Sequence, residues 1–303
     1  MPETSQRIIV VLNPGSGGGT ASSAQAELQP ILAGGGFSPE FVLLDGARDL
    51  REQLDPVLRT PAAAILVGGG DGTISSVADV IHGRGLRLGV LPLGTLNHFA
   101  RDLGIPQDLA SAAALVVAGH TMPVDAASVN DRVFLNNSSV GLYARIVALR
   151  ERYGARGPRK WLVATWATFN VMRRSHTLLA RMEVDGRAVL RETSLIFIGN
   201  NEYRMAGLDA GTRASLATGT LALYVVKAAG EWNLLKLVWH IVSGSARQSD
   251  DLEMLTATST RIDAPAGHHR HHVSVAIDGE LVPMSLPLEY RILPAAFEVF
   301  VPR

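Results

Sequence analysis

Four glycines and a threonine stand close together in the segment AAILVGGGDGTISSVADVI, residues 63–81. The apolar run before them is typical of a buried β-strand, and the residues after them have helical spacing. A strand that ends in glycine and continues into a helix directs backbone N–H groups outward at the positive end of the helix dipole, which favours phosphate binding. A tight turn without a ligand is the alternative interpretation, and this segment alone leaves both open. The residues concerned are Gly68, Gly69, Gly70, Gly72 and Thr73.

Two further turns follow apolar runs in the same way. They are NPGSGGGT at residues 13–20 and PLGTLNHFARDLGIP at residues 92–106. In an open α/β sheet all three turns would lie at the carboxyl ends of strands, where ligands bind. None has the Gly-Lys-Ser/Thr of a Walker loop, and none completes the dinucleotide pattern G-x-G-x-x-G. The usual nucleotide-binding folds are therefore poor matches.

The elements that must position these turns alternate between strand and helix. Apolar runs at residues 7–14, 41–46, 62–70 and 86–94 are separated by helical stretches, among them 21–32 and 49–58. Such a pattern indicates a parallel sheet covered on both faces. After Val124 the runs alternate in polarity between turn residues, which is typical of an antiparallel sandwich. We predict an α/β domain over residues 1–124 and an all-β sandwich over 125–293, with 294–303 a candidate for return to the first domain.

The composition excludes several classes of function. Lys plus Arg and Asp plus Glu are equal at 28 each, which argues against a nucleic-acid partner. The absence of cysteine excludes disulfides, thiolate zinc sites and thiol catalysis. The two most apolar helical segments meet Arg173 and Lys236 before they reach the ~20 residues of a membrane span. No export signal is visible at the amino terminus, so we expect a cytoplasmic protein.

Taken together, the three turns resemble those of the diacylglycerol kinase catalytic family, which includes sphingosine, ceramide and bacterial lipid kinases. The resemblance covers nearly the whole chain and implies a phosphofructokinase-like (Rossmann-like) domain, a β-sandwich and ATP between them. The implied reaction transfers the γ-phosphoryl group of ATP to a hydroxyl of diacylglycerol or a related lipid. It is carried by Asn13-Pro14 with Ser16-Gly17, by Gly69-Gly70-Asp71-Gly72-Thr73, by Gly94-Thr95 with Asn97 and Phe99-Ala100-Arg101, and by Asp278-Gly279-Glu280.

The resemblance also implies roles for single residues. Glycine amides and Thr73 would bind phosphates, and Arg101 would supply a cation. Asp71 would organise Mg²⁺ through water, since Mg²⁺ keeps several waters and takes few protein carboxylates. Asp125 would join this network, although a turn or cap aspartate fits its sequence equally well. The implied ATP-binding residues are Asn13, Ser16, Gly17, Gly68, Gly69, Gly70, Gly72, Thr73, Gly94, Thr95, Asn97 and Arg101.

Asp278 is the implied general base, with Glu280 in a supporting role. By pattern alone Asp278-Gly279 is a hairpin turn, because it follows the alternating strand HVSVAI. The resemblance reverses that preference. The second Asp-Gly, at Asp185-Gly186, lacks the following glutamate, and we interpret it as a plain hairpin.

The chain departs from the family pattern at four places. Gly18 and Gly19 stand where a lysine is frequent, so Arg101 would have to compensate. His98 replaces a frequent aspartate, and Leu44-Asp45 replaces a frequent threonine on the adenine side. Thr218-Gly219 replaces the Asp-Gly of a structural metal loop, so we predict that this metal is absent.

For three further segments we prefer a structural interpretation to a functional one. The four histidines of residues 267–272 lack neighbouring carboxylates or thiolates, which favours a solvated loop over a metal site. Apolar stripes at 162–169 and 235–242 have core spacing, with an acyl cleft or membrane-resting surface as the alternative.

Three functions remain open on these grounds. The first is a lipid kinase with ATP, Mg²⁺ and peripheral membrane contact. The second is a kinase of a soluble substrate, of the NAD kinase type. The third is a nucleotide-binding protein without turnover, which the missing lysine and His98 favour. The sequence names neither the acceptor lipid nor the oligomeric state.

Overall fold

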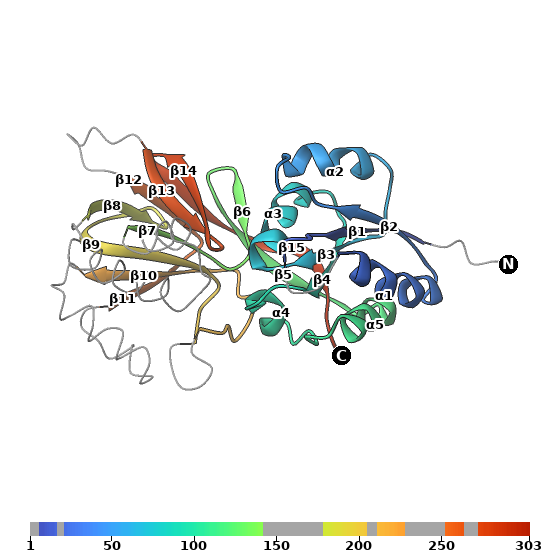
Figure 1. Ribbon diagram of the computed structural model, residues 1–303. Helices are drawn as coiled ribbons and strands as arrows, with labels where there is room; N and C mark the ends of the chain where they lie inside the picture. Colours follow the sequence, from blue (N-terminus) through green and yellow to red (C-terminus); the bar gives the residue numbers. More distant parts are fainter. Residues whose placement is uncertain (1–5, 17–20, 142–177, 205–210, 228–251, 264–271) are drawn as a thin grey trace, which may run out of the picture. The chain divides into compact units, whose positions relative to one another are not determined.

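The chain folds into two compact units, shown in the computed structural model of Figure 1. The structure describes residues 6–16, 21–141, 178–204, 211–227, 252–263 and 272–303. The N-terminal unit consists of Met1–Ala126, Val133–Leu135 and Leu293–Arg303. The sandwich unit consists of Ala127–Arg132 and Asn136–Ile292.

The N-terminal unit is a parallel sheet with helices between its strands, which confirms the predicted α/β class. Its strands lie in the order β4-β3-β1-β2, and each of these pairs is parallel. The elements in chain order are β1 (Gln6–Leu12), α1 (Ala21–Gly34), β2 (Phe37–Leu43), α2 (Leu50–Leu58), β3 (Ala64–Gly69), α3 (Asp71–Ile81), β4 (Arg87–Pro92), α4 (His98–Asp102) and α5 (Leu109–Ala118).

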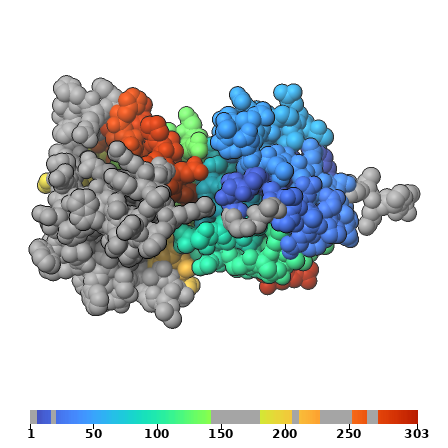
Figure 2. Space-filling view, in the orientation of Figure 1, coloured from blue at the N-terminus to red at the C-terminus, as the bar shows by residue number. Residues whose placement is uncertain are grey.

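The central strands of this unit are buried on both faces. Ile8 to Leu12 of β1 and Ala64 to Val67 of β3 have no exposed surface, as expected of continuous apolar runs in a parallel sheet. Figure 2 shows the surface of the molecule in the same orientation, coloured along the sequence. The sheet therefore presents the ends of its strands as places where polar chemistry can occur.

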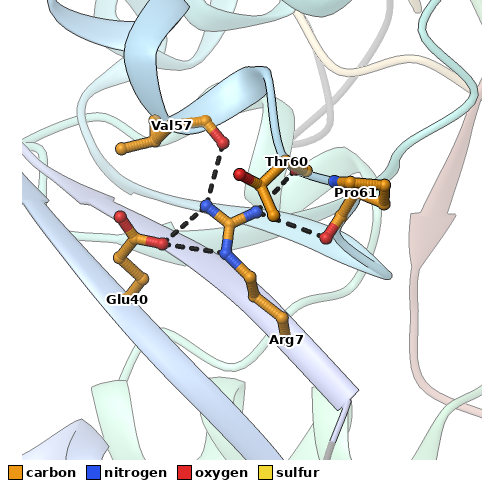
Figure 3. Close-up of polar contacts among 5 residues, drawn as sticks. All are labelled: Arg7, Glu40, Val57, Thr60 and Pro61. Carbon is orange, nitrogen blue, oxygen red and sulfur yellow. Dashed lines mark hydrogen bonds and ion pairs between the residues drawn. The ribbon is translucent and has the colours of Figure 1, made fainter.

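An arginine clamp closes the amino end of this sheet. Figure 3 shows the Arg7 guanidinium between the Glu40 carboxylate and three backbone carbonyls at the end of α2. Nε and Nη2 of Arg7 donate to Glu40 Oε2 at 2.8 and 2.5 Å. Nη1 donates to the carbonyls of Thr60 and Pro61, and Nη2 donates to that of Val57. The clamp ties β1, β2 and α2 together at the end of the strands opposite the glycine turns.

Two strands run from one unit into the other. β5 (Thr121–Val129) leaves the N-terminal unit after Ala126, and β15 (Leu288–Phe300) enters it at Leu293. β5 pairs with β15 and with the short strand β6 (Arg132–Phe134). Val299 of β15 lies in parallel register with Leu88, so the end of the chain extends the β4 edge of the sheet.

The sandwich unit is antiparallel, as the alternating patterns predict. Its main strand order is β14-β13-β7-β9-β8-β12-β15, and β10 pairs with β9 and β11. Leu221 to Val226 are buried between their partners. The strands are β7 (Asn137–Gly141), β8 (Leu178–Val184), β9 (Arg187–Asn200), β10 (Leu221–Lys227), β11 (Leu252–Ala257), β12 (Ser259–Asp263), β13 (His272–Ile277) and β14 (Glu280–Ser285).

Some predictions concern segments outside this description. The apolar stripes at 162–169 and 235–242, Gly17 to Gly19 of the first turn, and all of the histidine segment except His272 lie outside the described residues. Within the part of the chain that is described, no helix has the length and hydropathy of a membrane span.

Candidate functional site

The turn between β3 and α3 presents the amino end of a helix without a side-chain cap. Gly70 is the N-cap residue, its φ and ψ are −85° and 176°, and its carbonyl accepts the first helical hydrogen bond from Ile74 at 3.1 Å. The first N–H groups of a helix have no partner inside the helix. Asp71, Gly72 and Thr73 supply these groups, so the turn has the donors of an anion site.

Close packing explains three of the site's glycines but not Gly70. A Cβ atom at Gly94 would lie 2.5 Å from the Cα of Gly70, and one at Gly69 would lie 2.6 Å from the Cβ of Thr73. A Cβ at Gly68 would lie 2.6 Å from Leu12 Cδ2. At Gly70 the nearest atom would be 3.6 Å away, which is an ordinary contact. The fold itself therefore does not require glycine at position 70.

Asn13 ties the first turn to the second. Its Nδ2 donates to Thr73 Oγ1 at 2.8 Å, and its Oδ1 accepts from the Gly15 amide at 2.9 Å. The Asn13 amide donates to the Gly68 carbonyl at 2.9 Å, and Ser16 donates back to the Asn13 carbonyl. Accepting from Asn13 leaves the hydroxyl hydrogen of Thr73 for another acceptor.

Asp71 ties the second turn to the third. Its Oδ2 accepts from the His98 amide and its Oδ1 from the Phe99 amide, both at 3.0 Å. These are the first two residues of α4, whose own N-cap residue, Asn97, makes no capping bond with its side chain. Asp71 therefore caps a helix that starts 27 residues later in the chain. No local pattern around Asp71 predicts this role.

The buried side chain of Asn97 stabilises the third turn by hydrogen bonds. It has a φ of 50° and is 5% exposed, and its Nδ2 contacts the Pro92 carbonyl at 3.4 Å and Gln107 Oε1 at 3.2 Å. Its Oδ1 is buried without a hydrogen-bond partner. Thr95 and Arg101 of the same turn are exposed. The third turn and α4 thus expose a hydroxyl and a guanidinium to solvent.

Two buried aspartates brace the N-terminal unit. Asp125 is 2% exposed, and its Oδ1 accepts from the amide of Ala295, whose φ is 48°. Asp79 accepts from the Val133 amide at 2.8 Å and pairs with Arg51 at 3.0 Å. Sequence reasoning missed Asp79, although a carboxylate among the apolar positions of α3 was the available signal. Among the described residues no three His, Asp or Glu side chains gather closely enough to hold a metal ion alone.

Asp278 stands in a hairpin turn, as its pattern predicts. Asp278 and Gly279 have φ values of 45° and 88° and connect β13 to β14. Its Oδ1 accepts from the amides of Asn136 and Asn137 at 2.9 and 2.8 Å, and its own amide donates to the Asn137 carbonyl. The carboxylate is half-buried and Glu280 is exposed. The turn therefore fixes the orientation of a carboxylate at the start of β7.

The Asp185 turn has almost the same construction. Asp185 and Gly186 have φ values of 45° and 80° between β8 and β9, which confirms the predicted hairpin. Asp185 Oδ1 accepts from the amides of Thr258 and Ser259 at 2.9 and 3.0 Å. The Ser259 amide is the main cause that lowers the pKa of the Asp185 carboxyl. The two aspartates thus differ in surroundings and not in turn geometry.

Thr218 stands where the resemblance places a structural metal ligand. Its backbone amide donates to Asn201 Oδ1 at 2.8 Å, and its hydroxyl donates to the same oxygen. A further contact of 3.0 Å joins the hydroxyls of Thr218 and Thr220. Hydrogen bonds between side chains therefore organise this loop, and the absence of a structural cation stays a prediction.

Comparison with known proteins gives matches over both units. Residues 7–129 match the family described as "Diacylglycerol kinase catalytic domain", and residues 138–301 match the "YegS C-terminal NAD kinase beta sandwich-like domain". A "Probable lipid kinase YegS-like" of Klebsiella pneumoniae is 31% identical over 82% of this chain and 81% of its own. A "Diacylglycerol kinase" of Mycobacterium tuberculosis is 27% identical over 98% and 96%. A crystal structure of a diacylglycerol kinase from Bacillus anthracis shares the fold, with a TM-score of 0.74 at 24% identity over 99% and 98% of the two chains.

Proposed function

Because the chain belongs to the diacylglycerol kinase family of lipid kinases, we propose that it transfers the γ-phosphoryl group of ATP to a hydroxyl of diacylglycerol or a related lipid. The observation that supports this proposal is that hydrogen bonds and packing join three glycine turns at one edge of the sheet. Asn13 bonds to Thr73, Asp71 bonds to the α4 amides, and Gly94 packs on Gly70. Such an edge at the carboxyl ends of parallel strands suits a polyphosphate.

We assign ATP to the N-terminal unit. The phosphates would meet the amides of Gly70 to Thr73 and the Thr73 hydroxyl, and Gly70 would permit the closest approach. Arg101 would neutralise part of the phosphate charge in place of the frequent lysine of the first turn. Arg101 is exposed, so its guanidinium would be available to a bound nucleotide.

Asp71 also fits a place beside Mg²⁺. Each of its oxygens accepts one amide, and a carboxylate oxygen can accept a second hydrogen bond from a water of the metal. Asp125 fits less well, because it is buried and already bonded to Ala295. When bound, Mg²⁺ would neutralise charge on the β- and γ-phosphates. The residues of this chain would bind the nucleotide, orient the acceptor and take its proton.

Asp278 is the proposed proton acceptor. The acceptor hydroxyl oxygen would form a bond to Pγ while the bond from Pγ to the β,γ-bridging oxygen breaks and ADP leaves with that electron pair. The hydroxyl proton would pass to the Asp278 carboxylate. Two amide bonds hold this carboxylate in one orientation, which suits a loose transition state whose chief demands are position and charge. Glu280 would support this role from the first position of β14.

A lipid acceptor lies in a bilayer, so the proposal includes a cytoplasmic location and peripheral contact with the inner membrane face. The sandwich unit would provide the acceptor side, and phosphorylated lipid would enter phospholipid synthesis. A nucleotide-binding protein without turnover is the second candidate, favoured by His98 and by Gly18 and Gly19 in place of a lysine.

The proposal is tested with the purified chain, Mg²⁺ and γ-labelled ATP in detergent micelles. Parallel reactions contain diacylglycerol, monoacylglycerol, ceramide or sphingosine. We expect label in the lipid extract of one or more of these reactions. Tight ATP binding without label in any lipid would support the second candidate and reject the first.

A further inference from the structure

A buried arginine lies behind the Asp278 turn. Arg213 is 5% exposed, and its Nη2 donates to Asn136 Oδ1 at 2.7 Å while its Nη1 donates to the Asn200 carbonyl at 3.2 Å. Its guanidinium carbon also lies 5.6 Å from the centre of the Tyr203 ring. Burial of a cation is expensive unless its donors are satisfied. A buried arginine in an apolar sandwich therefore needs a reason beyond packing.

Asn136 connects this arginine to the proposed base. It is 4% exposed, and its amide donates to Asp278 Oδ1 at 2.9 Å. Its carbonyl accepts from the Asn200 amide at 2.9 Å, and its side-chain oxygen accepts from Arg213. Asn136 thus accepts a hydrogen bond from Arg213 through its side chain and donates one to the Asp278 carboxylate through its backbone amide.

The same arginine fixes the two strands that meet at this point. Asn136 precedes β7 and Asn200 ends β9, and these strands pair with Asn137 opposite Gly199. Arg213 bonds to both Asn136 and Asn200, so it limits movement of one strand end against the other. Asn137 adds a contact of 3.3 Å from its Nδ2 to the Tyr203 hydroxyl. Both amides that hold Asp278 therefore belong to one braced segment.

The Asp185 turn shows what this bracing adds. It has the same backbone and a similar pair of amide donors, to which the Thr258 hydroxyl adds a third hydrogen bond. In the described part of the chain, the Thr258 and Ser259 segment that holds Asp185 bonds to no arginine. Since a hairpin of this kind forms without such support, the arginine is not needed to make the turn.

We propose that Arg213 is a positioning residue for phosphoryl transfer, which acts through Asn136 to hold the amide pair that orients the Asp278 carboxylate. The inference rests on the proposed function, in which Asp278 takes the proton of the acceptor. Misplacement of a reacting group by ~1 Å costs about 10²-fold in rate. A brace of this kind therefore changes kcat and leaves ATP binding in the other unit unchanged.

The test is a double-mutant cycle on kcat with the acceptor lipid. Arg213→Met should lower kcat about 10- to 100-fold in the otherwise unchanged protein, with KM for ATP within about twofold. In the Asp278→Asn background the same change should lower kcat by less than about twofold, because the group it positions is already disabled. An equal loss in both backgrounds would overturn the proposal.

A second arginine of the same unit, more exposed than Arg213, helps to separate positioning from general damage. Arg191 lies in the same unit and donates two bonds to Glu253, at 2.6 and 2.7 Å. Arg191→Met should lower the melting temperature and leave kcat unchanged at a temperature where the protein stays folded. If Arg191→Met lowers kcat as much as Arg213→Met does, the loss reflects weakening of the sandwich and the proposal is wrong.

A second readout does not depend on turnover. Arg213→Lys keeps the charge, and it should shift the backbone amide resonances of Asn136 and Asn137 in a nitrogen–proton NMR spectrum. Resonances that stay at their original positions would overturn the proposal, even where Arg213→Met fails to fold. Failure of the proposed function gives a different result, since the unchanged protein would then label no lipid at all.

Discussion

Replacing Asp278 and Asp185 by asparagine, one at a time, separates a catalytic carboxylate from a turn residue. The two turns match in φ, in the glycine that follows and in the two amides that each Oδ1 accepts. Asparagine tolerates the left-handed backbone and offers the same acceptor oxygen. The pair therefore differs in the Thr258 hydroxyl, which also donates to Asp185 Oδ1 at 2.9 Å, and in what each carboxylate does beyond its turn.

The expected losses of stability are small at both turns. A hydrogen bond to a charged acceptor is worth about 1 kcal/mol more than one to a neutral acceptor, so the two amide bonds account for ~2 kcal/mol in Asp278→Asn. The three bonds to Asp185 Oδ1 account for ~3 kcal/mol in Asp185→Asn. The lowered pKa of the Asp185 carboxyl also indicates that its charged form stabilises the fold. This stabilisation is present above the unfolded pKa and is lost as the pH falls through the folded pKa. Both variants should remain folded.

The expected losses of rate are very different. A positioned base contributes ~10²–10⁴-fold, which is about 3–5 kcal/mol of barrier at ~1.4 kcal/mol per tenfold. Asp278→Asn should therefore lower kcat at least about 100-fold with the ATP dissociation constant nearly unchanged, and Asp185→Asn should retain wild-type kcat.

The assay is initial-rate phosphorylation of the accepted lipid, with calorimetric ATP binding and thermal melts on the same preparations. Near-normal turnover of a folded Asp278→Asn protein would refute the reasoning and move the role to Glu280 or Asp71. Equal losses in both variants would mean that the assay reports damage to the sandwich.

Three further predictions concern the N-terminal unit. Gly70→Ala should fold, because the added Cβ meets its nearest atom at 3.6 Å, yet weaken ATP binding; unchanged affinity in calorimetry would exclude phosphate from this turn. Gly34→Ala, with no atom within 4 Å of the added Cβ, is the control. Asp71→Asn should weaken ADP binding even in the presence of EDTA, because Asp71 caps α4; loss only with Mg²⁺ present would limit Asp71 to the metal. Arg7→Met should cost ~2–3 kcal/mol in urea unfolding and leave kcat unchanged, since its bonds lie at the amino end of the strands; an equal fall in kcat would contradict this separation.

Local patterns were sufficient to predict the elements that carry the site. Continuous apolar runs gave β1, β3 and β4, and alternating runs gave the strands of the sandwich, because burial on two faces or one face fixes these periods. The hairpin at Asp185 followed from its Asp-Gly pair for the same reason. Short-range rules therefore predicted the α/β class of the first unit and the antiparallel class of the second.

Contacts between distant residues could not be predicted in this way. Asp71 caps α4 from 27 residues away, and the Asn136 amide meets Asp278 across 142 residues. Arg213 is buried in the structure, whereas hydropathy alone predicts a charged residue on the surface. Such contacts depend on which strands become neighbours, and a single sequence does not state that.

The central claim is tested most directly by following the γ-phosphorus of ATP into its product. The purified chain is incubated with labelled ATP, Mg²⁺, NAD and diacylglycerol micelles together, and the label is divided among lipid extract, dinucleotide and inorganic phosphate. We predict label in the lipid extract, at a rate that Asp278→Asn lowers about 100-fold or more and Asp185→Asn leaves unchanged. Label in NADP, or in inorganic phosphate alone, would contradict the assignment of this chain as a lipid kinase.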